Sequence, residues 1–438
     1  MHGHFAAADT VTARSATHSN MAGSSSGNSL TQIVPARVQR YIVFGIGLIG
    51  LITIVGLIWL WPSAGELPGG GDYAGSDNRV LSGVVVGVRY DVDSDYAQDD
   101  PGTLLVQLAE SGEVVEVWAD FDLPANRIPI GSRVRVLDLV VYAPGGMGVT
   151  SRVFVFLDFN RSIPLSVLGI AFVAAVIAVA RWKGLAALIG LAVGLLMVWL
   201  FTIPALLVGR NPIIVALLTA TFVMFVVVYL AHGVSIKSTA ALLSTLVSIC
   251  FVTLIGWLAM SAAHIVPDLS GDFRELSAIM PGLNLRGVLL CGMVLAGVGV
   301  LNDVTITQAA TVWELRAASP TMSRQQIARA AMRIGRDHIA SSVYTMAFAY
   351  MGTSLALLLI TRMIDHTAFD YLNLNEVAQE LMATSVTSIG LVLAIPLATL
   401  VAAALITKPV PAMPAPTQVP PAVPLTRKAR RAAQTTAR

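Results

Sequence analysis

Charged residues are scarce in this chain of 438 residues, since Asp, Glu, Lys and Arg together make up 12% of it. That share is about half the share in an average soluble domain. Hydrophobic residues make up 55% and the mean hydropathy is +0.73. The shortage of charge and the repeated apolar runs close to 20 residues long exclude an ordinary soluble domain. They indicate a protein that crosses a membrane several times.

Cysteine is rarer still, and familiar catalytic motifs are missing. Cys250 and Cys291 both fall in apolar runs, so no disulfide framework or cysteine-rich metal site is available. We expect both thiols to be buried as small apolar side chains. The chain has no HExxH or GxSxG motif, and Gly69–Gly71 lacks the Lys-Ser/Thr of a phosphate loop. We therefore expect no enzyme activity, no metal and no cofactor.

Composition divides the chain into five regions. Residues 1–40 are rich in Ser, Thr, Ala and Gly and are expected to form a disordered cytoplasmic tail. Residues 41–61 form a first transmembrane helix, 62–161 an extracytoplasmic β-rich domain, 162–406 a seven-helix membrane domain and 407–438 a disordered basic cytoplasmic tail. The predicted fold is an all-α polytopic membrane bundle of eight transmembrane helices. A small β domain lies between its first and second helices.

The β-rich region alternates apolar and polar residues at period two. Turn residues separate the alternating stretches, as in Asp100-Pro101-Gly102. The expected strands are Val80–Tyr90, Thr103–Ala109, Glu113–Ala119, Arg133–Tyr142 and Arg152–Asp158. Five short strands predict a small barrel or sandwich, with an oligonucleotide-binding or SH3-like topology. The region is acidic and has no basic patch interleaved with aromatic residues, so the fold would not imply nucleic-acid binding.

We count eight apolar runs of the chain as membrane spans. They are Ile42–Leu60, Ile163–Ala180, Leu185–Val208, Pro212–Ala231, Ala240–Ala262, Gly287–Leu301, Ile339–Thr361 and Met382–Ile406. Alternate connections between them are rich in arginine and lysine, and the opposite connections carry most of the acidic residues. Because basic loops stay in the cytoplasm, we expect both termini to be cytoplasmic and the β domain to lie outside.

The stretch from Leu295 to Tyr350 is the exception to the shortage of charge. If Gly287–Arg316 is one continuous helix, Asp303, Thr307, Ala310, Thr311 and Glu314 share one narrow face, because residues advance by 100° each. Two carboxylates and two hydroxyls on one stripe suit a proton or cation relay. In the alternative interpretation, Asn302 or Asp303 only caps a new helix at the membrane interface.

A second helix is expected to begin at Ser323, because Ser323-Arg324-Gln325-Gln326 is a capping-box pattern. Its arginines would lie opposite an apolar side, as in a basic helix resting on the cytoplasmic membrane surface. Arg333 and Asp337 are four residues apart and can pair. The sharper hypothesis is that the arginines meet Glu314 or Asp303 and gate a path.

Three stretches resemble the YibE/F-like family of bacterial integral membrane proteins. They are LNDVTITQAATVWEL (301–315), IGRDHIASSVYTMAFAY (334–350) and SIGLVLAIPLATLVAA (388–403). Tyr344 stands where the family pattern has Asn. The resemblance covers about 161–406 and implies a multi-pass protein of the bacterial inner membrane, with no established activity. The resemblance adds three residues to the candidate polar path: Asn302, Thr305 and Gln308. The candidate cytoplasmic gate is formed by Arg333, Arg336, Asp337, His338 and Ser341.

The sequence thus favours a transport-related permease whose acidic polar stripe passes through Asp303. The alternative is a membrane scaffold or assembly factor that binds partners through its β domain and its basic cytoplasmic loop. The expected partners are the lipid bilayer, a small solute or ion, and a protein partner or a second copy of the chain, but not nucleic acid.

Overall fold

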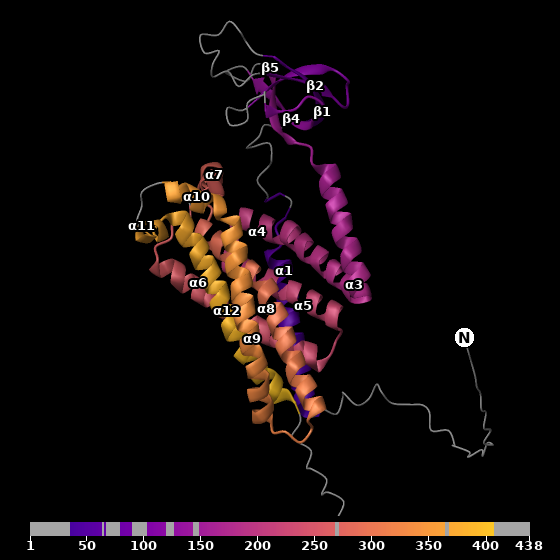
Figure 1. Cartoon of the computed structure of the whole chain (residues 1–438), viewed down its shortest axis with the longest axis vertical. Helices are drawn as coiled ribbons and strands as arrows, with labels where there is room; N and C mark the ends of the chain where they lie inside the picture. Colours follow the sequence, from indigo (N-terminus) through magenta and orange to yellow (C-terminus); the bar gives the residue numbers. More distant parts are fainter. Residues whose placement is uncertain are drawn as a thin grey trace, which may run out of the picture.

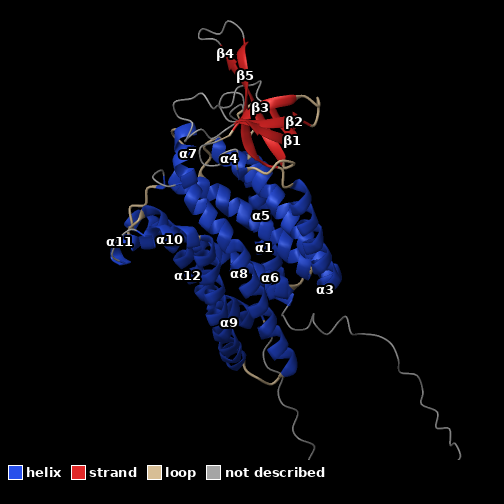
Figure 2. Cartoon of the chain, turned by 45° about the horizontal axis from the view of Figure 1, so that its top comes forward, coloured by secondary structure: helices blue, strands red, loops and turns tan. Residues whose placement is uncertain are grey.

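The computed structural model of the chain describes residues 36–63, 65–66, 79–89, 103–119, 127–142, 149–267, 271–363 and 368–406. The predicted C-terminal tail and nearly all of the predicted N-terminal tail lie outside these residues. A β barrel sits at one end of a long helical bundle (Figures 1 and 2). The first helix, α1, runs from Ala36 to Leu60 and therefore begins before the predicted residue 41.

The remaining elements follow in two groups. The strands are β1 (Arg79–Arg89), β2 (Thr103–Leu108), β3 (Val114–Trp118), β4 (Arg133–Tyr142) and β5 (Val149–Phe159). The helical elements are α3 (Ser162–Met197), the π-helical η3 (Val198–Thr202), α4 (Ile203–Leu207), α5 (Pro212–His232), α6 (Ile236–Ala262), α7 (Gly271–Ile279), α8 (Leu285–Ala318), α9 (Arg324–Thr353), α10 (Leu355–Met363), α11 (Ala368–Leu372) and α12 (Asn375–Leu405).

The described strands close into a barrel in the order β1-β2-β3-β5-β4. Neighbouring strands are antiparallel except for β3 and β5, which run parallel. Alternation drives this arrangement, because every second residue of β2 and β3 points into the core, including Leu104, Val106, Val115 and Val117. The expected small barrel is thus confirmed. Its closed five-stranded order fits the oligonucleotide-binding type of topology.

Within the described residues, six helices are long and apolar enough to cross a membrane. The centre of the bundle is formed by α6, α8 and α12, with α5 packed beside them. Small residues allow the close approach: a Cβ added at Gly390 of α12 would overlap Val252 of α6. On α3, Gly190 and Gly194 face Val227 and Val223 of α5. Such small-residue contacts replace hydrophobic burial where lipid surrounds the helices.

The expected second and third spans form one continuous apolar stretch, Ser162–Leu207, of 46 residues. It reverses direction at Arg181, which has φ 53° and ψ −130°. These angles are those of the first central residue of a type II′ turn, a position that usually takes glycine. Figure 1 shows α3 running away from the barrel and then turning back toward α4. The sequence therefore placed the break correctly, although no loop separates the two halves.

Helix α9 differs from both sequence predictions for its region. The expected span Ile339–Thr361 is divided at Ser354 between α9 and α10, and α9 is not among the described helices apolar enough to cross a membrane. Its charged half was also expected to lie along the membrane surface. Instead α9 stands along the bundle and packs against α8 and α12 through Met332, Ile339 and Met346 (Figure 1). Six helices of the described residues are long and apolar enough to cross a membrane, so the predicted eight separate spans are not confirmed.

One smaller expectation is wrong. Cys291 is buried in the core of the bundle, but Cys250 is exposed on the surface of α6. Although α6 is apolar enough to cross a membrane, its apolar run alone does not decide whether a thiol faces another helix or the outer surface of the bundle.

Candidate functional site

The candidate site is built on α8, which is one continuous helix, the condition under which the sequence places Asp303 and Glu314 on one face. Asn284 caps its first turn, because the Asn284 side-chain oxygen accepts a hydrogen bond from the Gly287 amide over 3.0 Å. The helix then runs without a break to Ala318. Asn302 and Asp303 lie in its interior, so neither residue caps a helix. The interpretation of Asp303 as an interfacial cap is therefore wrong.

Helix α8 has one face that no other described element covers. The residues within about 40° of Asp303 on this face are Gly292, Ala296, Gly299, Thr307, Ala310 and Glu314. Asp303 and Glu314 are exposed, and Thr307 is half-buried. A Cβ added at Gly292 or at Gly299 would meet no atom within 4 Å. We call this surface the open face of α8.

Thr311 lies at the edge of the open face. It is half-buried, and its hydroxyl donates to the Thr307 carbonyl over 2.9 Å. That bond is internal to the helix, so the Thr311 proton is committed to the backbone. Asp303, Thr307 and Glu314 therefore share the open face, and Thr311 lies at its margin.

The opposite side of α8 carries buried polar groups. Thr305 is fully buried, and its hydroxyl lies 2.6 Å from the hydroxyl of Thr245 on α6. Each hydroxyl also reaches a carbonyl of its own helix, Leu301 for Thr305 and Ala241 for Thr245. A polar group in a membrane bundle must find such partners. This contact therefore fixes α8 against α6 and leaves Thr305 away from the open face.

Gln308 joins three helices. Its side-chain nitrogen donates to the Ala331 carbonyl of α9 over 2.9 Å and to the Thr399 hydroxyl of α12 over 2.7 Å. Gly335 allows this approach, because a Cβ there would lie 2.6 Å from Ile395 Cγ2 and 3.0 Å from the Gln308 side-chain oxygen. The three sequence stretches singled out above contribute Gln308, Gly335 and Thr399, so they meet at this one junction.

Asn302 stands between the two sides of α8. Its side chain is half-buried, and its side-chain oxygen is fully shielded without a hydrogen-bond partner among the described residues. An unsatisfied amide oxygen at membrane depth costs free energy. It is also the next residue to Asp303, so an unused acceptor lies beside the carboxylate.

The predicted gate residues all lie on α9. The capping box is formed, because the Ser323 amide donates to the Gln326 side-chain oxygen and the Gln326 amide donates to Ser323 Oγ, over 2.8 and 3.2 Å. Beyond it, the candidate gate residues are all exposed: Arg333, Arg336, Asp337, His338 and Ser341.

Among the described residues, no ion pair closes over the open face. The ion pairs among the described residues lie in the barrel, in the link from the barrel to α3 and between Arg210 and Glu66. Asp303 and Glu314 are in none of them, and the expected pair of Arg333 with Asp337 is not formed in this part of the chain. The contacts of Gln308 set the register of α9, which places His338 at about the height of Asp303.

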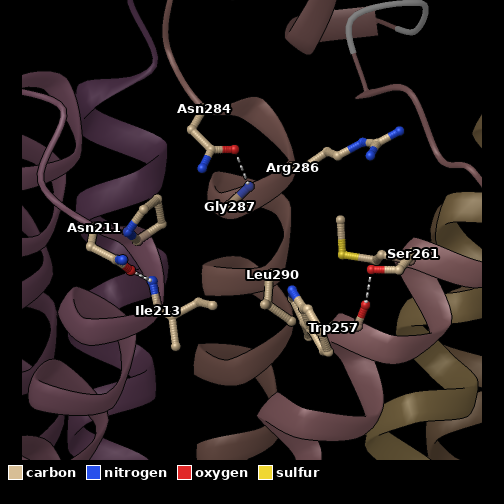
Figure 3. Close-up of a pocket in the computed structure, with 10 residues that line it drawn as sticks. Asn211, Ile213, Trp257, Ser261, Asn284, Arg286, Gly287 and Leu290 are labelled. Atoms are coloured by element: carbon tan, nitrogen blue, oxygen red, sulfur yellow. Dashed lines mark hydrogen bonds between the residues drawn. The ribbon is translucent and has the colours of Figure 1, made fainter.

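A cavity that the sequence analysis missed lies at the other end of α8. It has a volume of about 250 Å³, and α5, α6 and α8 line it with Asn211, Trp257, Ser261, Asn284 and Arg286 (Figure 3). Asn211 caps α5 as Asn284 caps α8, and Arg286 Nε donates to the Ile265 carbonyl over 2.7 Å. The signal in the sequence was the Asn-Pro pair that opens α5.

The cavity and Asp303 are far apart on the same helix. Arg286 and Asp303 are separated by about 25 Å of helical rise. Among the described residues, no group of three or more His, Cys, Asp or Glu side chains could hold a metal ion. The chemistry available at Asp303 is therefore exchange of a proton or loose association with a cation at a single carboxylate.

Apolar helices of membrane length around buried amide and hydroxyl contacts define an integral membrane protein. The sequence profile of the YibE/F-like protein family matches residues 168–408, more than half of the chain. The protein therefore belongs to the YibE/F-like family. It matches no curated protein and no solved structure.

Proposed function

We propose that the protein is a permease that moves protons or a small cation past Asp303. One observation carries the proposal: an exposed carboxylate lies on the open face of a helix that is apolar enough to span a membrane. An ionised carboxylate at that depth costs about 2.5 kcal/mol or more, so residues of this kind usually mark a pathway or a proton relay. Thr307 and Glu314 extend the same face toward the end of the helix.

The proposed topology has eight crossings in the bacterial inner membrane. The 46 residues of Ser162–Leu207 span about 69 Å as helix, which is enough for two crossings of a hydrocarbon core about 30 Å thick. The second half of α9 together with α10 supplies the remaining crossing. The distribution of basic loop residues supports cytoplasmic termini and an extracytoplasmic barrel.

A scaffold that binds a protein partner through the barrel is the second candidate. The observation that favours it is the set of exposed large apolar side chains on the barrel, with Trp118 66% and Ile130 69% exposed. Exposed aromatic anchors are typical of docking surfaces. In this proposal Asp303 would have no part in the activity.

Flux measurements separate the two proposals. The purified chain in liposomes with a pH-sensitive dye inside should release a proton gradient, and Asp303→Asn should abolish the release because the titratable group is lost while the side-chain shape is kept. Glu376→Gln at the exposed start of α12 is the matched control and should leave the flux unchanged. Equal flux from the Asp303→Asn protein would reject the proton proposal, and the same assay with Na⁺ or K⁺ gradients tests the cation.

Growth of a deletion strain across metals, drugs and pH identifies the physiological substrate. Under the permease proposal Asp303→Asn fails to restore growth and Trp118→Ala restores it. Under the scaffold proposal the two variants behave in the opposite way.

A further inference from the structure

A groove that is distinct from the open face of α8 runs between α9 and α12. It has a volume of about 710 Å³ and is lined by the first part of α9. That part of α9 lies at the end of the bundle away from the barrel (Figure 1). Arg329, Arg333 and Arg336 line it together with Met332 and Leu400. Arg324 Nε donates to the Ile406 carbonyl over 2.8 Å, which ties the start of α9 to the end of α12 below the groove.

The arginines form one positively charged edge of the groove. They lie at positions i, i+4 and i+7, within about 60° of one another around α9 and over about 10 Å of its length. All are exposed, and none forms an ion pair with another described residue. No acidic side chain of the described residues lines the groove. The charge is therefore available for an external anion.

The other edge of the groove carries apolar side chains, and Gln325, Gln326 and Ala328 also line the groove. Met322 and Met332 come from the α9 side, and Leu400 of α12, 63% exposed, comes from the other. In a helix that crosses a membrane, such an exposed leucine faces lipid chains. The arginine stems can lie along this surface and bring their guanidinium groups to the level of the head groups.

We propose that this groove binds an anionic phospholipid. The guanidinium groups of Arg329, Arg333 and Arg336 would donate hydrogen bonds to the phosphate, for which their planar geometry is well suited. An acyl chain would lie against Met332 and Leu400. A soluble phosphate would use only the charged edge, whereas a phospholipid is complementary to both edges. The inference does not depend on the proposed transport, because the groove shares no residue with the open face.

Native mass spectrometry of the whole detergent-purified chain tests the inference. The chain is mixed with phosphatidylglycerol, with phosphatidylcholine of the same acyl chains, or with phosphatidylglycerol plus inorganic phosphate. We expect the chain to retain phosphatidylglycerol in preference to phosphatidylcholine. The apparent affinity for phosphatidylglycerol should fall on the order of fivefold for each arginine replaced in Arg329→Gln, Arg333→Gln and Arg336→Gln. Inorganic phosphate should not displace the lipid.

The matched control is Arg40→Gln, which removes an exposed arginine from α1, outside the groove. It should retain phosphatidylglycerol as the unmodified chain does. If it loses as much lipid as Arg333→Gln does, binding follows net charge and the site is rejected. The lipid assignment also fails if the triple variant keeps its affinity or if inorganic phosphate alone competes fully. Circular dichroism of each variant establishes that it is folded. Leu400→Ala tests the apolar edge of the groove, because it should weaken the retention of phosphatidylglycerol without any change of charge.

Discussion

Gln308 donates a hydrogen bond to the hydroxyl of Thr399 over 2.7 Å, although 91 positions separate the two residues. Thr399 in turn donates to the Ile395 carbonyl of its own helix, so its oxygen is free to accept from Gln308. The pair locks α8 to α12, and the second proton of the Gln308 amide locks α8 to α9. The helix that carries Asp303 is therefore held on its buried side by polar contacts that leave the open face untouched.

Gly335→Ala should destabilise the folded protein by about 1–3 kcal/mol, because the added methyl group would overlap Ile395 and crowd Gln308. Gly352→Ala is the control in the same helix, since a Cβ at Gly352 meets nothing within 4 Å. That change should be neutral or stabilising by up to about 1 kcal/mol. Unfolding in detergent, followed by circular dichroism, measures both. Equal stability of the two variants would contradict the close approach of α9 to α8.

The open face should accept a large side chain. Gly299→Leu is expected to change stability by less than about 1 kcal/mol, because no atom lies near the added group. Gly297→Leu should cost about 1–3 kcal/mol or prevent folding, because Gly297 is buried against Thr387 and Val252. The comparison uses the melting temperature of each purified variant. A large loss in Gly299→Leu would mean that another molecule covers this face in the purified protein.

Glu314→Gln should lower the flux only in part if Asp303 is the main transfer point. Glu314 lies about 16 Å further along α8 on the same face, so it can collect or release the ion without setting the barrier. The liposome assay measures this loss against Asp303→Asn. A complete loss in Glu314→Gln would move the main transfer point to Glu314, and no loss would remove Glu314 from the path.

Single cysteines should label from opposite sides of the membrane. Ser111→Cys lies in the exposed turn after β2, and Gln325→Cys lies in the exposed first turn of α9. The background carries Cys250→Ala and Cys291→Ala, because Cys250 is exposed and would react. A membrane-impermeant maleimide should label Ser111→Cys in intact cells and Gln325→Cys only after lysis. Labelling of both sites in intact cells would overturn the proposed orientation.

The link between the barrel and α3 should open in acid. The hydrogen bond from Arg161, and after it the bond from the Phe159 amide, holds the pKa of Asp158 below its usual range. A carboxyl group whose pKa is lower in the folded state stabilises that state at neutral pH, and this stabilisation is lost as the pH falls through the folded pKa. Hydrogen exchange from about pH 6 to about pH 3 should show the end of β5 loosening. Asp158→Asn should remove this dependence, and a variant that keeps the full dependence would show that Asp158 is not its source.

Local patterns predicted local structure well. Arg133–Tyr142 is a strand with the predicted bounds, and Ser323 forms its capping box, because alternation and capping depend on nearby residues alone. The continuity of α8 was one of two interpretations that the sequence left open, because a helix cap at Asn302 or Asp303 would have divided it. The orientation of α9 did not follow from a local pattern, since a helix with one basic side can either lie on a membrane or stand upright with that side outward. Only packing against α12 decides between the two.

The candidate site was predictable in its chemistry and only partly in its geometry. Helical spacing put Asp303 and Glu314 on one face correctly. No spacing rule could show that Gln308 points away from them toward Thr399, because that contact joins distant segments. Arg333 and Asp337 are both exposed, and they form no ion pair among the described residues. A spacing of four residues allows such a pair, but the side-chain conformations decide whether it forms.

The passage from β5 to α3 is only two residues long, Asn160 and Arg161. The Asn160 amide donates to the Arg133 carbonyl in the barrel, and its side-chain oxygen accepts from the Ser162 amide at the start of α3. Asn160 is thus hydrogen-bonded both to the barrel and to the start of α3, while Arg161 adds an ion pair to Asp158. A connection of two residues that is hydrogen-bonded on both sides leaves little freedom for the barrel to rotate independently of α3. A rotation of the barrel would therefore displace the first half of α3, up to the turn at Arg181 that leads into the half packed on α5.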